Sequence, residues 1–462
     1  MRDRALAVGL VAAFMTLLDV SIVNVAIPSI QAGLDVGDSG LQWVLSGYAL
    51  TFGLLLVPAG RFGDARGIRG VFVAGLLAFT LTSALAGAAR DEVWLVVARL
   101  LQGAAAGVLN PQVTGLIQRL YRPAERARPF GLLGATVGLA TAIGPLLGGL
   151  LIHVAGPTEG WRWIFYINVP VGVAAAVLGW RIIPRRPAEQ RRRESLDPLG
   201  VVLLGLAVVQ ILLPLVEGRQ WQTPAKWLLV VTGLATLGAF AGWERHFARR
   251  AVPLIQLSLF RVRSYRLGTT VVLVYFAGFT ANFFIFTLYL QQGHGYSALA
   301  AGLTLTPFAV GSGVAAFVGG RIVNRFGRAL VAFGLVAVMA GFAASIAVIH
   351  VVPPTAVHLY LALPLLVAGI GSGLVITPNQ TLTLAEVPVE RSGSASGVVQ
   401  TAQRIGAAFG IAAIGSVFFA RIDAGWNAAL TAALLAAIGF LLLALVAALA
   451  DIRGARRLGC EQ

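Results

Sequence analysis

Charged residues are scarce in this sequence. Only 12% of its 462 residues are charged, whereas 58% are hydrophobic. Soluble domains carry about 25% charged residues. The composition therefore excludes an ordinary soluble domain and predicts a helical integral membrane protein.

Lysine and cysteine each occur only once. Lys226 lies in a short loop without the glycines of a phosphate loop, which excludes a P-loop ATPase within this chain. One cysteine, Cys460, can form neither an intramolecular disulfide nor a thiolate metal cluster, and the five histidines lack metal-ligand spacing. We therefore expect no metal and no cofactor.

Apolar runs long enough to cross the ~30 Å hydrocarbon core occur fourteen times. When the basic residues are assigned to alternate sides of the membrane, starting with the N-terminus inside, 28 of the 35 fall in inside segments and five in outside segments. This positive-inside bias predicts cytoplasmic termini and explains the net charge of +16 without a nucleic acid partner. The runs cover residues 5–27, 41–60, 70–89, 93–117, 129–152, 162–180, 198–217, 226–243, 266–290, 299–320, 329–349, 357–378, 394–418 and 427–450.

Two pairs of similar loop segments divide the chain. Residues 60–69 resemble residues 320–328, and residues 123–126 resemble residues 388–391, at offsets of 260 and 265 residues. The two halves therefore share one plan, in parallel orientation, with a surplus between them. The predicted parts are an N-terminal six-helix bundle at 1–182, a linker with two extra membrane helices at 183–264, and a C-terminal six-helix bundle at 265–462.

The surplus segment, residues 183–264, contains clear signals of a linker and of a helix start. Residues 185–193 form a basic linker, and Asp197 followed by Pro198 predicts a helix start. Residues 253–260 are apolar, too short to span, and flanked by arginines. We expect them to lie along the inner leaflet.

The first run contains one acid, Asp19, about 20 Å from the end at which the chain enters. A carboxylate at that depth costs several kcal/mol unless it is neutralised, paired or open to water. Two readings follow. Asp19 is either a proton or cation site facing a cavity, or a structural acid hydrogen-bonded between helices.

Five short motifs follow one another through the first half. They are residues 18–28, residues 60–69 (motif A), residues 99–103 (motif B), Gly138 with residues 144–149 (motif C), and residues 161–170. With these motifs the chain resembles the fourteen-helix drug:proton antiporter branch of the major facilitator superfamily, the EmrB/QacA type. The resemblance implies an all-α membrane fold of two parallel six-helix bundles plus two inserted helices.

The resemblance also implies a role for Asp19. In the family, the first and fourth helices line the cavity, so Asp19 and Arg99 would couple directly, through water or through Gln102. A nearby Arg favours the ionised acid, and its withdrawal favours protonation. The alternative is a static pair that only orients two helices.

Motif A implies a cytoplasmic gate latch between the halves. Its glycines allow a tight turn, and Asp64 can face a helix N-terminus or a guanidinium. Asn324 takes the place of the acid in the second half, which predicts an asymmetric latch. The candidate gating residues are Gly60, Asp64, Arg66, Gly67 and Arg69.

Motif C implies antiport. Small residues four apart permit close helix crossing, and Pro145 would introduce a bend. Ordinary membrane packing explains the same pattern. The candidate residues are Gly138, Gly144, Pro145, Gly148 and Gly149.

Polar and aromatic residues within the runs are candidates for the substrate cavity. Arg404 lies near mid-membrane with no matching acid in the second half, so it either binds an anionic or carbonyl-bearing substrate or pairs with backbone carbonyls. The ninth run is rich in aromatic residues that could stack on a planar amphiphile. The candidates are Asn24, Gln102, Asn282, Phe279, Gln400, Gln403 and Arg404.

These observations predict a proton-coupled multidrug-type efflux transporter of a bacterial plasma (inner) membrane, not an enzyme. It would export amphiphilic small molecules by alternating access, drawing on the proton gradient, as a monomer among membrane lipids. One alternative is an exporter dedicated to a single endogenous metabolite or antibiotic. A proton symporter for uptake, a membrane-embedded enzyme and a non-transporting scaffold are further alternatives.

Overall fold

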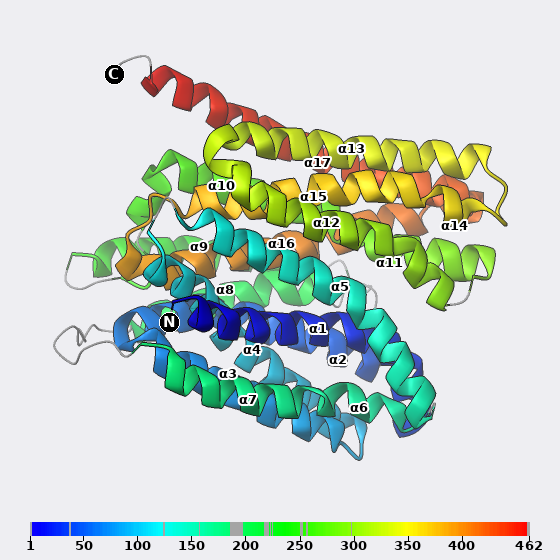
Figure 1. Ribbon diagram of the computed structural model, residues 1–462, viewed down its shortest axis with the longest axis horizontal. Helices are drawn as coiled ribbons and strands as arrows, with labels where there is room; N and C mark the ends of the chain where they lie inside the picture. Colours follow the sequence, from blue (N-terminus) through cyan, green and yellow to red (C-terminus); the bar gives the residue numbers. More distant parts are fainter. Residues whose placement is uncertain are drawn as a thin grey trace. The chain divides into compact units, whose positions relative to one another are not determined.

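The computed structural model describes residues 2–36, 38–122, 125–156, 158–184, 197–216, 221, 223, 225–249, 253–255, 257–296 and 298–459. These residues form helices joined by short turns, and the described ranges contain no β-strand. The all-helical prediction is therefore confirmed. Figure 1 labels the helices along the chain. They are α1 (Arg2–Leu34), α2 (Asp38–Arg66), α3 (Ile68–Gly87), α4 (Glu92–Leu120), α5 (Ala127–Ala155), α6 (Gly160–Tyr166), α7 (Asn168–Ile182), α8 (Pro198–Val216), α9 (Lys226–Phe247), η3 (Leu257–Arg261), α10 (Arg263–Phe279), α11 (Ala281–Leu288), η4 (Tyr289–Gly293), α12 (Ala298–Phe326), α13 (Arg328–Val351), α14 (Val357–Tyr360), α15 (Ala362–Thr383), η5 (Val389–Arg391), α16 (Ser392–Phe419), η6 (Ile422–Ala424) and α17 (Trp426–Gly459).

Thirteen helical segments in the described ranges are long and apolar enough to cross a membrane. A shorter apolar helix at Pro198–Pro214 corresponds to the remaining run of the fourteen. Some predicted boundaries are wrong. Helices α2 and α12 continue through residues 60–66 and 320–326, which the sequence pattern predicts as loops. Helix α1 continues past Pro28 to Leu34. Membrane helices tolerate an interior proline where neighbouring groups satisfy the freed carbonyl.

The described chain forms two compact units. The first comprises Met1–Arg122, Leu147–Leu259 and Val387–Thr401, and the second comprises Pro123–Leu146, Phe260–Glu386 and Ala402–Gln462. Helices α5 and α16 are therefore each divided between the units. The three-part division at residues 182 and 264 stays a prediction.

In the first unit, α4 is the central packing partner of α2 and α3, and α7 packs on α3. Glycines allow the close approach of α2 to α4. A Cβ on Gly103 would collide with the carbonyl oxygen of Tyr48, and one on Gly107 would lie 2.5 Å from that of Phe52. Small residues at such crossings are the usual means of packing membrane helices.

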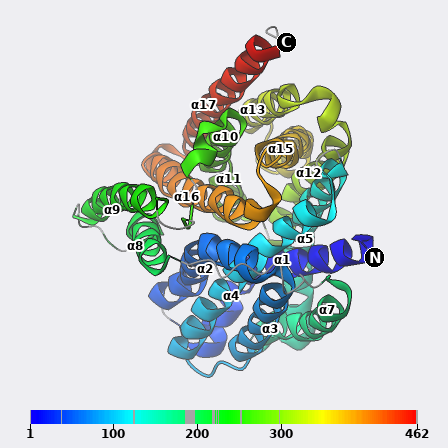
Figure 2. The ribbon, with the colours of Figure 1, turned by 90° about the vertical axis from the view of Figure 1, so that its left-hand side faces the viewer.

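Helices α8 and α9 pair with each other in the first unit, and Figure 2 shows them side by side. The predicted start of α8 is confirmed. Asp197 Oδ1 accepts the backbone N–H of Gly200 at 3.0 Å, and Pro198 is the first helical residue. The basic linker at residues 185–193 lies outside the described residues.

In the second unit, α15 packs between α12 and α13, and α17 packs on α10 and α13. A large apolar core lies among these helices and includes Tyr275, Phe342 and Phe418. The ninth run forms one helical segment from Arg263 to Gly293, which ends in a π-helical turn at Tyr289–Gly293. Thr280 keeps helical backbone angles between α10 and α11, and its Oγ1 donates to the Phe276 carbonyl at 2.9 Å.

Candidate functional site

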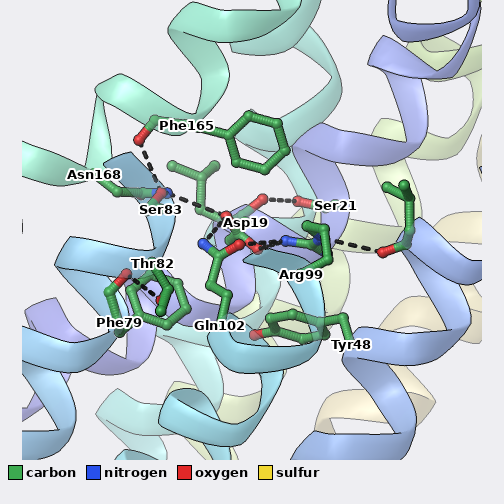
Figure 3. A network of polar contacts seen from close by, with 12 residues as sticks. Asp19, Ser21, Tyr48, Phe79, Thr82, Ser83, Arg99, Gln102, Phe165 and Asn168 are labelled. Atoms are coloured by element: carbon green, nitrogen blue, oxygen red, sulfur yellow. Dashed lines mark hydrogen bonds and ion pairs between the residues drawn. The ribbon is translucent and has the colours of Figure 1, made fainter. Parts of the chain in front are cut away.

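The Asp19 carboxylate is the centre of a buried polar network in the first unit (Figure 3). Asp19 Oδ2 lies 2.6 Å from Arg99 Nη1, and the two side chains are 0% and 1% exposed. The predicted proximity of α1 and α4 at these two residues is therefore observed, and the contact is direct. Breaking a buried ion pair by removing one partner costs about 3–5 kcal/mol, since it leaves an uncompensated charge.

The other carboxylate oxygen has two amide donors. Asp19 Oδ1 accepts from Gln102 Nε2 at 2.9 Å and from Asn168 Nδ2 at 3.1 Å. Asn168 also donates to Ser83 Oγ at 3.0 Å, and Ser83 in turn donates to the Phe165 carbonyl at 2.9 Å. The carboxylate is thus fixed by helices α1, α3, α4, α6 and α7 together.

The guanidinium of Arg99 has further contacts. Its Nε donates to the Val44 carbonyl of α2 at 3.0 Å, and its Nη1 donates to Gln102 Oε1 at 2.8 Å. Its Cζ lies 4.3 Å from the ring centroid of Tyr48, which adds a cation–π interaction. The close approach of α2 that Gly103 permits is what brings Val44 and Tyr48 within reach.

A guanidinium and two amide N–H groups all complement the negative charge of the Asp19 carboxylate. The side chain is fully shielded in this structure and is hydrogen-bonded between helices.

Asn168 and Ser83 were not among the sequence candidates. Asn168 lies in the segment 161–170, where the sequence showed an amide inside an otherwise apolar helix. Such a residue is a signal for a polar partner in the membrane. The sequence could not identify Asp19 as its partner, because α7 and α1 come together only in the folded protein.

Thr80 Oγ1 lies where a Cβ on Gly172 would be, so glycine permits the close packing of α7 on α3.

The second polar site joins α2 to the start of α16. Asp64 Oδ1 accepts the N–H of Gly393 at 3.1 Å, and Asp64 Oδ2 accepts the N–H of Ser394 at 2.9 Å. Arg119 Nη2 lies 3.3 Å from Asp64 Oδ1. The acid of motif A therefore faces both a helix N-terminus and a guanidinium, two partners that complement a carboxylate.

Backbone contacts surround this carboxylate. A Cβ on Gly393 would lie 2.6 Å from the Gly60 carbonyl oxygen and 2.9 Å from Asp64 Oδ1, so only glycine fits there. One turn further on, the hydroxyls of Thr114 and Ser396 are 2.5 Å apart. We refer to the contacts of Asp64 and Gly60 with residues 392–394 as the α2–α16 contact.

The remaining motif A residues are placed around the turn after α2. Gly67 has a φ of 101°, a backbone conformation that favours glycine. Arg66 lies over the ring of Phe62 at 5.1 Å, and Arg69 lies over that of Trp180 at 4.4 Å. Both arginines thus form cation–π contacts on either side of the turn.

The motif C glycines divide into two groups. Gly138 packs on α12 in the second unit, where an added Cβ would lie 2.8 Å from Gly313 Cα. Gly144 and Gly148 are buried, whereas a Cβ on Gly149 would meet no atom within 4 Å. The side chain of Pro145 lies outside the described set.

The predicted cavity residues have varied environments. Gln102 belongs to the Asp19 network. Phe279 stacks on Tyr275 and Phe308, with centroid distances of 5.2 and 5.5 Å, and Asn282 Nδ2 donates to the Gly278 carbonyl of its own helical segment. The others are Gln400, which donates to Ser396 Oγ at 3.0 Å, Gln403 and Arg404, which are half-buried, and Asn24, whose side chain is outside the described set.

The second unit contains a polar cluster of its own that sequence reasoning missed. Arg328 Nε at the start of α13 lies 2.6 Å from Asp451 Oδ2 of α17. Arg328 also bonds Asn379 of α15, and Asn379 donates to the Gly268 carbonyl of α10 at 2.9 Å. This arginine lies four residues after Asn324, which belongs to the last turn of α12.

The sequence is similar to known membrane transporters. Residues 9–411 match the family model described as Major Facilitator Superfamily. Among curated relatives, a probable actinorhodin transporter of Streptomyces coelicolor is 36% identical over 421 residues, covering 90% of this chain and 72% of the relative. A puromycin resistance protein of Streptomyces alboniger is 35% identical over 89% of this chain and 81% of the relative. The multidrug resistance protein Stp of Mycobacterium tuberculosis is 33% identical over 89% and 75%.

Solved structures share the fold. The human organic anion transporter MFSD10 superposes with a TM-score of 0.71 at 17% identity, covering 97% of this chain and 99% of that chain. The proton:xylose symporter XylE superposes with a TM-score of 0.67 at 14% identity, covering 96% and 94%. At such low identity, these matches bear on the fold alone.

Proposed function

The chain belongs to the major facilitator superfamily, and we propose that it is a proton-coupled antiporter that exports amphiphilic small molecules. It is an efflux transporter of that superfamily, related to antibiotic resistance and export proteins. The relatives are named for actinorhodin transport, puromycin resistance and multidrug resistance, which supports the export of small molecules. The multi-pass helical fold with about thirteen to fourteen candidate spans fits this role.

One observation carries the proton-coupling part of the proposal. The Asp19 carboxylate is buried, ion-paired with Arg99 and surrounded by amide donors. Such a carboxylate stays ionised while the pair is intact, and it takes up a proton when the guanidinium withdraws. Exchange between the two states would load a proton from one side of the membrane and release it on the other.

The α2–α16 contact supplies the conformational part. Asp64 of α2 binds the N-terminus of a helix from the other half of the sequence. Releasing that contact would separate α2 from α16, as alternating access requires. We propose that Asp64 stabilises one access state by holding α2 against α16. Arg99 would stabilise the same state at the proton site by pairing with Asp19.

The membrane arrangement is part of the proposal. Two parallel six-helix bundles with two inserted helices, and both termini in the cytoplasm of a bacterium, fit the repeat offsets and the distribution of basic residues. Protons and an amphiphilic solute are the proposed partners, without a cofactor. An exporter dedicated to one compound is the second candidate, since a relative is named for a single compound, actinorhodin.

Inside-out membrane vesicles with an imposed proton gradient test this function. Puromycin and ethidium serve as probes, and a pH-sensitive dye reports the vesicle lumen. We expect each transported probe to enter the vesicles and to make the acidified lumen more alkaline. Probe accumulation that persists after the gradient is collapsed, or a pH change of the opposite sign, would contradict antiport.

A further inference from the structure

The hairpin of α8 and α9 contains two buried acids that belong to neither site described above. Asp197 precedes α8 and Glu244 lies near the end of α9, and both side chains are 0% exposed. A Cβ on Gly200 would contact Asp197 Oδ2 and lie 2.7 Å from Glu244 Oε1, so the two oxygens converge on one point. The two carboxyl groups are within hydrogen-bond reach of each other.

N–H groups bond one oxygen of each acid. Asp197 Oδ1 accepts from the backbone N of Gly200 and from Trp243 Nε1 at 2.9 Å, and Glu244 Oε2 accepts from the backbone N of Ile255 at 2.8 Å. Among the described residues, no N–H or O–H group is positioned as a donor to Glu244 Oε1. The other oxygens of the two acids therefore face each other.

Two ionised carboxylates would present only acceptors to each other in this enclosed place. One proton converts one of them into a donor and completes the hydrogen bond. Carboxyl pairs in contact usually share a proton for this reason, because like charges cannot both persist there. The pair then retains one negative charge.

Arg61 is the nearby positive group. It lies on α2, is 3% exposed, and interacts electrostatically with Glu244. Among the described residues of the neighbouring elements, Arg245, His246, Arg249 and Arg261 are exposed. The guanidinium of Arg61 thus compensates the one negative charge that a singly protonated pair retains.

We propose that Asp197 and Glu244 form a second proton-binding site of this protein, which holds one proton shared between the two carboxyl groups. Arg61 lies three residues before Asp64 on α2, so the same helix end contacts both this pair and α16. Movement of that end away from α16 also moves Arg61. The pair then binds a second proton, taken from the aqueous phase, in place of the lost positive charge. Proton binding here and the α2–α16 contact are therefore linked, independently of Asp19.

Infrared spectroscopy of the purified full-length protein tests the shared proton directly. We expect a carboxylic acid C=O band at neutral pH that shifts in D2O and disappears reversibly as the pH is raised. The band should be absent from Glu244→Gln and from Asp197→Asn, and retained in Asp423→Asn, which changes an exposed acid. An unchanged band in both pair variants would overturn the proposal, and so would a wild-type spectrum without any such band.

Thermal unfolding of variants in which Glu244 or Asp197 is replaced by its amide tests how many protons the carboxyl pair holds. In Glu244→Gln the amide N–H donates to Asp197 while its carbonyl still accepts from Ile255, and in Asp197→Asn the amide N–H donates to Glu244. We expect both single variants to keep the wild-type Tm. In the double variant two NH2 groups face each other, and Tm should fall. A double variant as stable as wild type would mean two protons and would reject one shared proton. Single variants that both unfold would show that an amide donor cannot replace the shared proton, which also rejects the proposal.

Discussion

The Asp64 carboxylate accepts the backbone N–H of Ser394 at 2.9 Å, across 330 residues of sequence. This bond and its neighbour to Gly393 satisfy N–H groups in the first turn of α16 that have no partner within the helix. An acid in the last turn of one helix thereby stabilises the first turn of another. The contact is short and rigid because Gly60 and Gly393 bring the two backbones together.

Asp64→Asn should weaken the α2–α16 contact. The asparagine removes the charge that interacts with the helix N-terminus and with Arg119, an effect of about 1–2 kcal/mol. We expect a lower Tm of the purified protein and slower export of puromycin in vesicles. The matched control is Asp3→Asn, since Asp3 is an exposed acid that accepts from the Tyr121 hydroxyl at 2.8 Å. Equal losses in both variants would contradict a special role for Asp64.

Two glycines of α5 provide a matched pair for motif C. Gly138→Ala places a methyl group 2.8 Å from Gly313 Cα, so α5 and α12 must separate, and overpacking of this kind costs about 1–3 kcal/mol. Gly149→Ala meets no atom within 4 Å and should change stability by less than about 0.5 kcal/mol. Thermal unfolding and export are the measurements. A Gly138→Ala protein that behaves like Gly149→Ala would remove the packing role.

Asp19→Asn should abolish proton-driven export. It also leaves the Arg99 guanidinium buried without its counter-ion, which is expected to cost about 3–5 kcal/mol. The double variant Asp19→Asn with Arg99→Gln removes both charges and should recover much of the lost stability. We expect this double variant to fold and still fail to couple probe movement to protons. Normal coupling in the double variant would exclude Asp19 from the mechanism.

Asn168→Ala should destabilise the Asp19 network. The carboxylate loses one of its two amide donors, and hydrogen bonds to charged groups contribute about 1.5–3 kcal/mol. Ser83→Ala removes a bond only to Asn168 and to a carbonyl, so its effect should be smaller. Differential scanning of the two purified variants measures the order. The reverse order of Tm values would assign the stabilisation to Ser83 instead.

Asp451→Asn should destabilise the second unit. Arg328 is mostly buried and lies 2.6 Å from this carboxylate, so its charge would lose its counter-ion at a cost of about 3–5 kcal/mol. Export should fall in proportion to the folded protein that remains. Asp423→Asn is the exposed-acid control, and identical unfolding temperatures for these two variants would show that the Arg328 pair adds no net stability.

The sequence by itself determined the class of protein, the number of apolar runs and several site residues. Long apolar runs must be helices in a membrane, because only helices satisfy their own backbone there. A lone acid in such a run must find a partner, so Asp19 was recognisable without coordinates. Asp64 was recognisable too, since a positive-inside loop explains arginines but not an acid.

The tertiary structure decided which groups form hydrogen bonds and ion pairs with these acids. Asn168, Ser83 and the Val44 carbonyl reach the Asp19–Arg99 pair only because glycines let α2, α4, α7 and α3 pack closely. Sequence spacing cannot reveal such partners, since each lies on a different helix and the distance between helices depends on every side chain in the crossing. The shielding of Asp19 and the proximity of Asp197 to Glu244 likewise depend on the tertiary structure. Burial and pairing are properties of the assembled helices, whereas hydrophobicity and charge are already present in the chain.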